Sequence, residues 1–81
     1  MEPVIRSTKA LGASIRKARR EAGLTQAALG LGTGLRQATI SSLESGEGGT
    51  LDSLFKLCTF LKLEMRLAPR STAQLDLDEI F

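Results

Sequence analysis

The chain has 81 residues and a formal net charge of +2, with 42% hydrophobic, 25% charged and only 4% aromatic residues. This length predicts one domain with a small core, built mainly from Leu, Ile and Ala. A single cysteine and no histidine exclude a disulfide framework within one chain and a zinc site of the usual Cys/His kind. Because the sequence has neither an apolar run of about 20 residues nor the apolar core of a signal peptide, we expect a soluble, cytoplasmic protein without metal or cofactor.

Charge is distributed unevenly along the chain. Eleven basic and six acidic residues lie up to Arg70, which leaves this part with a net charge of +5. Residues 71 to 81 carry three acidic and no basic residues, Asp76, Asp78 and Glu79. A basic body indicates an anionic partner such as nucleic acid. We therefore expect one domain over residues 1–69 and a flexible acidic tail over 70–81 with a different target.

The N-terminal half predicts two helices. Pro3 and the lack of periodicity argue against a helix in the first eight residues. From Lys9 the apolar residues recur at helical spacing, and Gly23 ends the helix; the face consists of Leu11, Ile15, Ala18 and Ala22. Thr25 is the expected N-cap of a second helix that runs from Gln26 to about Gly32.

The C-terminal half predicts two further helices and a strand. Gly34 suits a turn with positive φ, and a third helix from about Gln37 to Ser45 ends at Gly46. Thr50 should cap a fourth helix over about 51–61. We expect that helix to be buried through Leu51, Leu54, Phe55, Leu57, Cys58 and Leu61. Apolar and charged residues then alternate from Leu63 to Leu67, which is strand periodicity.

Two short helices joined by a glycine turn make a helix-turn-helix, whose second helix reads base edges in the major groove. The run G-L-T-Q-A-A-L-G-L-G-T-G-L-R-Q-A-T-I-S-S-L-E-S-G, Gly23 to Gly46, resembles the core of the Xre/Cro-type helix-turn-helix family. The resemblance implies an all-α, lambda-repressor-like domain of four to five helices. It departs from the family pattern at Gly30, at Gly32, and at Arg36, where a Ser usually caps the recognition helix.

The segment after the fourth helix narrows the resemblance. Q-A-T-I-S, T-L-x-x-x-F-K and L-K-L-E-M-R-L, within residues 37–67, are similar to the HipB antitoxins. In those repressors a short C-terminal strand pairs with its copy to form an intersubunit two-stranded sheet, here through Leu63, Met65 and Leu67. The resemblance implies a homodimer that binds an inverted repeat in its own operon and also binds HipA, a serine/threonine kinase toxin.

The helix-turn-helix geometry and the family resemblance assign roles to individual residues. The expected base contacts are Gln37, Ala38, Ser41 and Ser42, because Gln can pair with adenine and Ala can contact a thymine methyl. The expected phosphate contacts are Gln26, Arg36, Thr39 and Arg16. The family implies an ion pair between Arg19 and Glu44, either purely structural or also holding Arg19 near a phosphate. Ile80 and Phe81 are candidate toxin contacts.

Several alternatives remain open at this point. Arg16, Lys17 and Arg20 are either phosphate contacts or simply a solvated helix face. The protein could be a stand-alone Xre-type regulator, such as a phage or restriction-modification controller, or an adaptor that uses the fold for protein contacts alone. We do not expect an enzyme, because the sequence offers no histidine base, phosphate loop or metal-ligand cluster.

Overall fold

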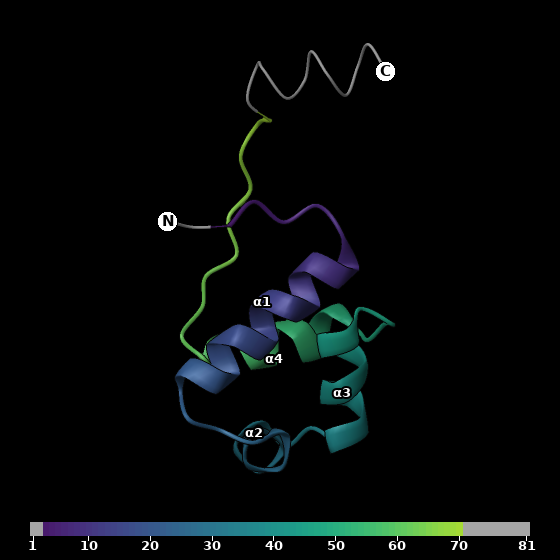
Figure 1. Ribbon diagram of the computed structural model, residues 1–81, viewed down its shortest axis with the longest axis vertical. Helices are drawn as coiled ribbons and strands as arrows, with labels where there is room; N and C mark the ends of the chain where they lie inside the picture. Colours follow the sequence, from purple (N-terminus) through teal and green to yellow (C-terminus); the bar gives the residue numbers. More distant parts are fainter. Residues whose placement is uncertain (1–2, 71–81) are drawn as a thin grey trace.

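The computed structural model describes residues 3–70, which form four helices followed by an extended segment (Figure 1). The helices are α1 (Thr8–Glu21), α2 (Gln26–Thr33), α3 (Gln37–Ser45) and α4 (Leu51–Phe60). The predicted order and boundaries are confirmed to within about one residue. The all-α, helix-turn-helix fold expected from the sequence is therefore correct.

Short polar side chains and glycines set the helix boundaries. Thr25 and Thr50 cap α2 and α4 as predicted, since their hydroxyls accept from the N–H groups of Ala28 and Ser53 at 3.0 and 3.1 Å. Ser7 caps α1 in the same way, which starts this helix at Thr8 rather than at Lys9. Gly34 and Gly46 end α2 and α3 in the left-handed conformation, with φ of 76° and 80°.

One apolar residue set from all four helices makes the core. Its buried members are Ile15, Leu29, Ile40, Leu54, Leu57 and Cys58. Leu11, Leu24, Leu35, Leu43 and Leu61 pack against this cluster and are partly buried. Burying a side chain of this size contributes about 1.5–3 kcal/mol, so a handful of residues holds the four short helices together.

The expected burial of α4 is wrong at two positions. Leu51 and Phe55 are 73% and 51% exposed. In α4 only the face that carries Leu54, Leu57 and Cys58 meets the core. Leu51 lies in the first turn and Phe55 at the edge of the apolar face. Helical spacing identifies an apolar face but not how far the neighbouring helices cover it.

After α4 the chain turns sharply and leaves the helical body. Lys62 adopts a left-handed φ of 60°, and the N–H of Leu63 bonds the Cys58 carbonyl oxygen at 2.8 Å, which is the hydrogen bond of a Schellman cap. Residues 63–70, here called the arm, then extend away from the helices without regular secondary structure (Figure 1). The strand predicted at Leu63 to Leu67 is not formed within this single chain and stays a prediction.

Candidate nucleic-acid interface

The third helix presents a polar face of small side chains to solvent. Gln37, Ala38 and Ser41 are exposed, whereas Thr39 and Ser42 are half-buried. On the opposite face Ile40 is fully buried, and Glu44 is 8% exposed. Residues three and four positions apart share a helix face, so Ser41 lies beside both Gln37 and Ala38, and the three exposed residues form one surface at the start of α3. All four residues expected to contact bases therefore lie on α3, with Ser42 the least accessible of them.

Arg36 occupies the N-cap of α3 and makes no capping hydrogen bond with its side chain. Its backbone is extended, with φ −73° and ψ 145°, and the side chain is exposed. A cation at this position faces the positive end of the helix dipole and costs a few tenths of a kcal/mol or more. A bound phosphate would reverse the sign of that interaction, because it places negative charge beside both the guanidinium and the helix end.

A buried ion pair fixes α3 against α1, as the family resemblance implies. Arg19 Nε donates to Glu44 Oε2 at 2.6 Å, and Arg19 Nη2 donates to Glu44 Oε1 at 3.0 Å. Arg19 Nη1 also donates to the Leu24 carbonyl at 2.8 Å. Both side chains are nearly inaccessible, with 10% and 4% exposure. The two-pronged geometry fixes both the position and the rotation of α3 relative to α1.

Gln26, the first residue of α2, joins this network. Its Nε2 donates to Glu44 Oε1 at 3.2 Å, so the residue expected to contact a phosphate is held by the ion pair. An amide nitrogen carries two N–H donors. One bond to Glu44 therefore leaves a second donor at the N-terminus of α2, and the phosphate contact stays a prediction.

The charge state of Glu44 follows from these contacts. Burial by itself raises the pKa of the carboxyl, but hydrogen bonds from Arg19 and Gln26 and the charges of Arg19 and Arg16 outweigh it, so the pKa of Glu44 lies below its ordinary value. The hydrogen bond to Glu44 likewise raises the pKa of Arg19 against the opposing effect of burial. Both groups are therefore ionised at neutral pH.

Gly12 lets α1 and α3 approach closely, a role that was not predicted from the sequence. A Cβ atom at this position would collide with the backbone carbonyls of Leu43 and Glu44. Gly30 has a similar role between α2 and the turn, because its Cβ would lie 2.8 Å from the Leu35 carbonyl oxygen. The available signal for Gly12 was a glycine inside an otherwise regular helix, which costs about 1 kcal/mol unless packing requires it.

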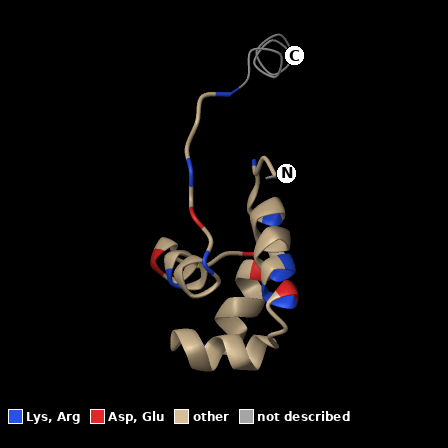
Figure 2. Cartoon of the chain, turned by 90° about the vertical axis from the view of Figure 1, so that its left-hand side faces the viewer, with Lys and Arg blue, Asp and Glu red and all other residues tan. Residues whose placement is uncertain are grey.

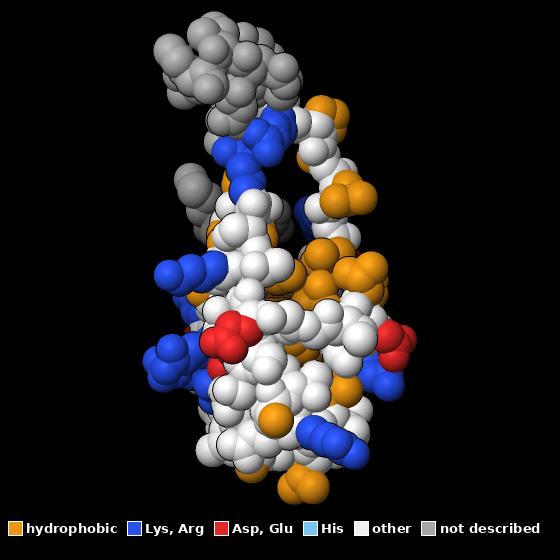
Figure 3. Space-filling view, turned by 90° about the vertical axis from the view of Figure 1, so that its right-hand side faces the viewer, with side chains coloured by type: hydrophobic (Ala, Val, Ile, Leu, Met, Phe, Trp, Pro, Cys, Tyr) orange, Lys and Arg blue, Asp and Glu red, His pale blue; other side chains and the backbone are white. Residues whose placement is uncertain are grey.

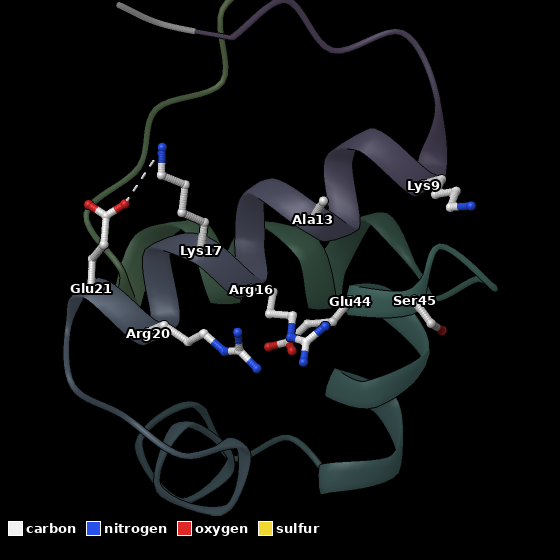
Figure 4. Close-up of a pocket in the computed structure, with 8 residues that line it drawn as sticks. All are labelled: Lys9, Ala13, Arg16, Lys17, Arg20, Glu21, Glu44 and Ser45. Carbon is white, nitrogen blue, oxygen red and sulfur yellow. Dashed lines mark ion pairs between the residues drawn. The ribbon is translucent and has the colours of Figure 1, made fainter.

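A groove of about 640 Å³ runs between α1 and the C-terminal end of α3 (Figure 4). It is lined by Lys9, Ala13, Arg16, Lys17, Arg20, Glu21, Glu44 and Ser45. Figure 4 shows Arg16 and Arg20 extending toward the Glu44 carboxylate, while Lys9 and Ser45 lie at the other end. Figure 2 shows that much of the basic charge of the helical body gathers along α1. We call this surface the α1–α3 groove.

The opposite side of the molecule is apolar. Figure 3 shows hydrophobic side chains gathered at the foot of the arm, on the side away from the basic residues of α1. Exposed apolar residues of α4 and the arm include Phe55, Phe60, Leu63, Met65 and Leu67, of which Leu67 is 99% exposed. Ile80 and Phe81, the candidate toxin contacts, lie outside the described residues.

Two further properties concern residues 3–70 as a whole. None of their helices has the length and apolarity to cross a membrane. Within the same range no three His, Cys, Asp or Glu side chains are grouped in a way that could hold a metal ion.

Comparison with known proteins identifies the class. A profile of the helix-turn-helix family matches residues 15–67. A HipB variant in its complex with the O2 20mer has a similar structure, with a TM-score of 0.80 and 33% identity over 88% of this chain and 100% of that chain. HipB in a HipA–HipB–O2–O3 complex gives a TM-score of 0.79 and 32% identity over 86% and 100% of the two chains. No curated protein sequence matches the chain.

A second group of similar structures consists of restriction-modification controllers. The controller C.AhdI from Aeromonas hydrophila has a TM-score of 0.65 and 29% identity over 70% of this chain and 88% of that chain. The chain is therefore a helix-turn-helix DNA-binding regulator of the Xre type. Within that class it belongs to the HipB-like family, which matches it over most of its length.

Proposed function

We propose that this protein is the antitoxin and repressor of a toxin–antitoxin pair, which binds an inverted repeat in its own operon as a homodimer and also binds a HipA-type serine/threonine kinase. The observation that carries the proposal is the match to HipB over the whole length of that chain, including a HipB structure solved with HipA. As a repressor of its own operon it acts on DNA in the cytoplasm.

The proposed DNA contacts follow from the exposed face of α3. Gln37 can pair with adenine through both its amide donor and its acceptor, and Ala38 can contact a thymine methyl. Ser41 and Ser42 lie one turn further along the helix. Phosphate contacts by Arg36, Gln26, Thr39 and Arg16 would position α3 without reading sequence.

Two substitutions in neighbouring residues separate these roles. Gln37→Ala should weaken binding to the specific operator by about 1–3 kcal/mol and leave random-sequence DNA almost unaffected. Arg36→Ala should weaken both, because a phosphate contact is independent of sequence. The measurement is a binding titration at stated salt with a duplex from upstream of the coding sequence and a scrambled duplex. Unchanged operator binding by the Gln37→Ala protein would place the recognition surface elsewhere.

The homodimer is proposed on the α4 and arm side. Leu63, Met65 and Leu67 alternate with charged residues and are exposed in the single chain. A strand needs an edge to pair with, and an identical edge is available in a second copy. A two-fold axis would also place two recognition helices about 34–36 Å apart, one turn of DNA.

The toxin contact is proposed for the acidic tail. Ile80 and Phe81 would dock in a pocket of the kinase, and Asp76, Asp78 and Glu79 would steer the approach. Removing residues 73–81 should weaken binding to the kinase, more strongly at low salt, and leave operator binding intact or slightly tighter. Unchanged affinity for the kinase would move the partner surface to the helical body.

A stand-alone regulator is the second candidate. Two restriction-modification controllers support it: C.AhdI, and C.Esp1396I with 25% identity and a TM-score of 0.63. Purification of the tagged protein from its own cells separates the two functions. A kinase that co-purifies and is encoded next to this chain favours the antitoxin, whereas an adjacent restriction or methylation enzyme favours the controller.

A further inference from the structure

The α1–α3 groove carries positive charge that is not paired in salt bridges within the described part of the chain. Lys9, Arg16 and Arg20 line it, are exposed, and have no ion-pair partner within residues 3–70. The remaining cation, Lys17, lies 3.9 Å from Glu21 in an i, i+4 ion pair. The groove therefore offers three cations to an external partner.

The acidic residue inside the groove does not cancel this charge. The Glu44 carboxylate accepts hydrogen bonds from both Nε and Nη2 of Arg19, so the Arg19 charge balances its negative charge. Arg16 and Arg20 extend toward the Glu44 carboxylate (Figure 4). The groove therefore keeps a net positive charge, although two carboxylates are among its lining residues.

The dimensions of the groove fit an extended polyanion. Lys9 and Arg20 are eleven residues apart on one helix, which corresponds to about 16 Å along its axis. Successive phosphates of one DNA strand advance by about 3.4 Å along the duplex axis, so the groove spans several of them. Gln26 joins it to the recognition elements, since Gln26 bonds Glu44 at the groove wall and begins α2.

We propose that the α1–α3 groove binds the sugar-phosphate backbone of DNA, with Lys9 and Arg20 as phosphate contacts on either side of Arg16. This inference rests on the proposed function and extends it, because Arg16 is the one contact proposed above that lies on α1, and the others come from α2, α3 and the residue that caps α3. The groove adds a sequence-independent contact along α1 and lengthens the DNA segment that one protomer covers.

The test compares two double variants that remove the same charge from opposite sides of the protein. Lys9→Gln with Arg20→Gln changes the groove, whereas Lys56→Gln with Lys62→Gln changes the region of α4. The probe is a random-sequence duplex of about 30 base pairs, titrated between 50 and roughly 300 mM salt. All four side chains are exposed, and thermal unfolding of each protein checks that the fold persists.

The groove variant should reduce the slope of log K against log salt by about 1.8, because each lost phosphate contact removes about 0.9. The α4 variant should leave that slope within about 0.3 of wild type. Equal slopes for the two variants would mean that net charge alone governs binding, which overturns the proposal. A wild-type slope in the groove variant would assign the groove to a partner other than DNA, such as an acidic protein segment. Absence of any DNA binding by the wild-type chain would contradict the proposed function itself.

Discussion

The α1–α3 side and the α4–arm side of this molecule differ in how far one chain satisfies its own side chains. On the first side, polar groups bond one another within one chain, because Arg19 and Gln26 both donate hydrogen bonds to Glu44. The buried Ile40 also anchors the recognition helix in the core. On the second side, large apolar side chains such as Phe55 and Leu67 face solvent in the described residues. One chain alone therefore preforms the surface proposed to read DNA, whereas the apolar side is proposed to be covered by a second copy.

The largest expected effect on the α1–α3 side comes from removing one partner of its buried ion pair. Arg19→Ala should lower the free energy of unfolding by about 3–5 kcal/mol, because it leaves the Glu44 charge buried without compensation. Urea denaturation followed by circular dichroism measures this change. Arg20→Ala, the exposed neighbour, is the matched control and should cost less than about 0.5 kcal/mol beyond helix propensity. Equal losses in the two variants would show that the pair contributes little to the fold.

The same pair predicts a direction of pH dependence. The pKa of Glu44 is lower in the folded protein than its ordinary value of 4.5, so the unfolded chain binds the proton first. The stabilisation is fully present above about pH 4.5 and is lost as the pH falls through the lowered pKa. The difference in stability between wild type and Glu44→Gln should therefore shrink in that acidic window. A difference that stays constant down to pH 2 would contradict the assignment.

The close packing of α1 on α3 is expected to contribute the next largest share of stability on this side. Gly12→Ala places a methyl group against the Leu43 and Glu44 carbonyls and should destabilise the protein by about 1–3 kcal/mol. In an unpacked helix the same change would stabilise by about 1 kcal/mol, so the sign of the effect is diagnostic. Thermal unfolding measures it. A stabilised Gly12→Ala protein would mean that the two helices do not approach closely at this position.

The second side is tested through its proposed strand. Met65→Pro removes one ladder donor from each arm of the dimer, at about 0.5–1.5 kcal/mol per hydrogen bond, and kinks the strand. The dimer dissociation constant should therefore rise by roughly 5- to 150-fold. Analytical ultracentrifugation measures it, with Met65→Leu as a control that keeps both the apolar side chain and the N–H group. A wild-type chain that stays monomeric at high micromolar concentration would contradict the proposed pairing of the two strands.

The sequence predicted the helices and the recognition helix well, and it predicted the closely packed contacts less well. Thr25, Thr50, Gly34 and Gly46 are local signals, so the boundaries that depend on them are correct. The pairing of Arg19 with Glu44 could be anticipated only from the family resemblance, because 25 residues separate the two.

Other features depend on how the helices meet in space. The need for glycine at position 12 arises from the carbonyls of α3, and the exposure of Leu51 and Phe55 arises from the limited cover over α4. Helical periodicity carries no information on either. The α1–α3 groove likewise depends on the three-dimensional arrangement. Arg19 balances the charge of Glu44, and Arg16 and Arg20 extend toward that carboxylate from a different helix.

Chemical-shift mapping of the ¹⁵N-labelled protein with a duplex from upstream of its coding sequence tests the central claim most directly. Our account predicts that DNA shifts the amide signals of residues 36–42 and of the α1–α3 groove, while signals of residues 55–67 keep the values they have in the free dimer. Shifts concentrated on α4 and the arm, with the amides of Gln37 and Ser41 unchanged, would contradict the assignment of the two sides.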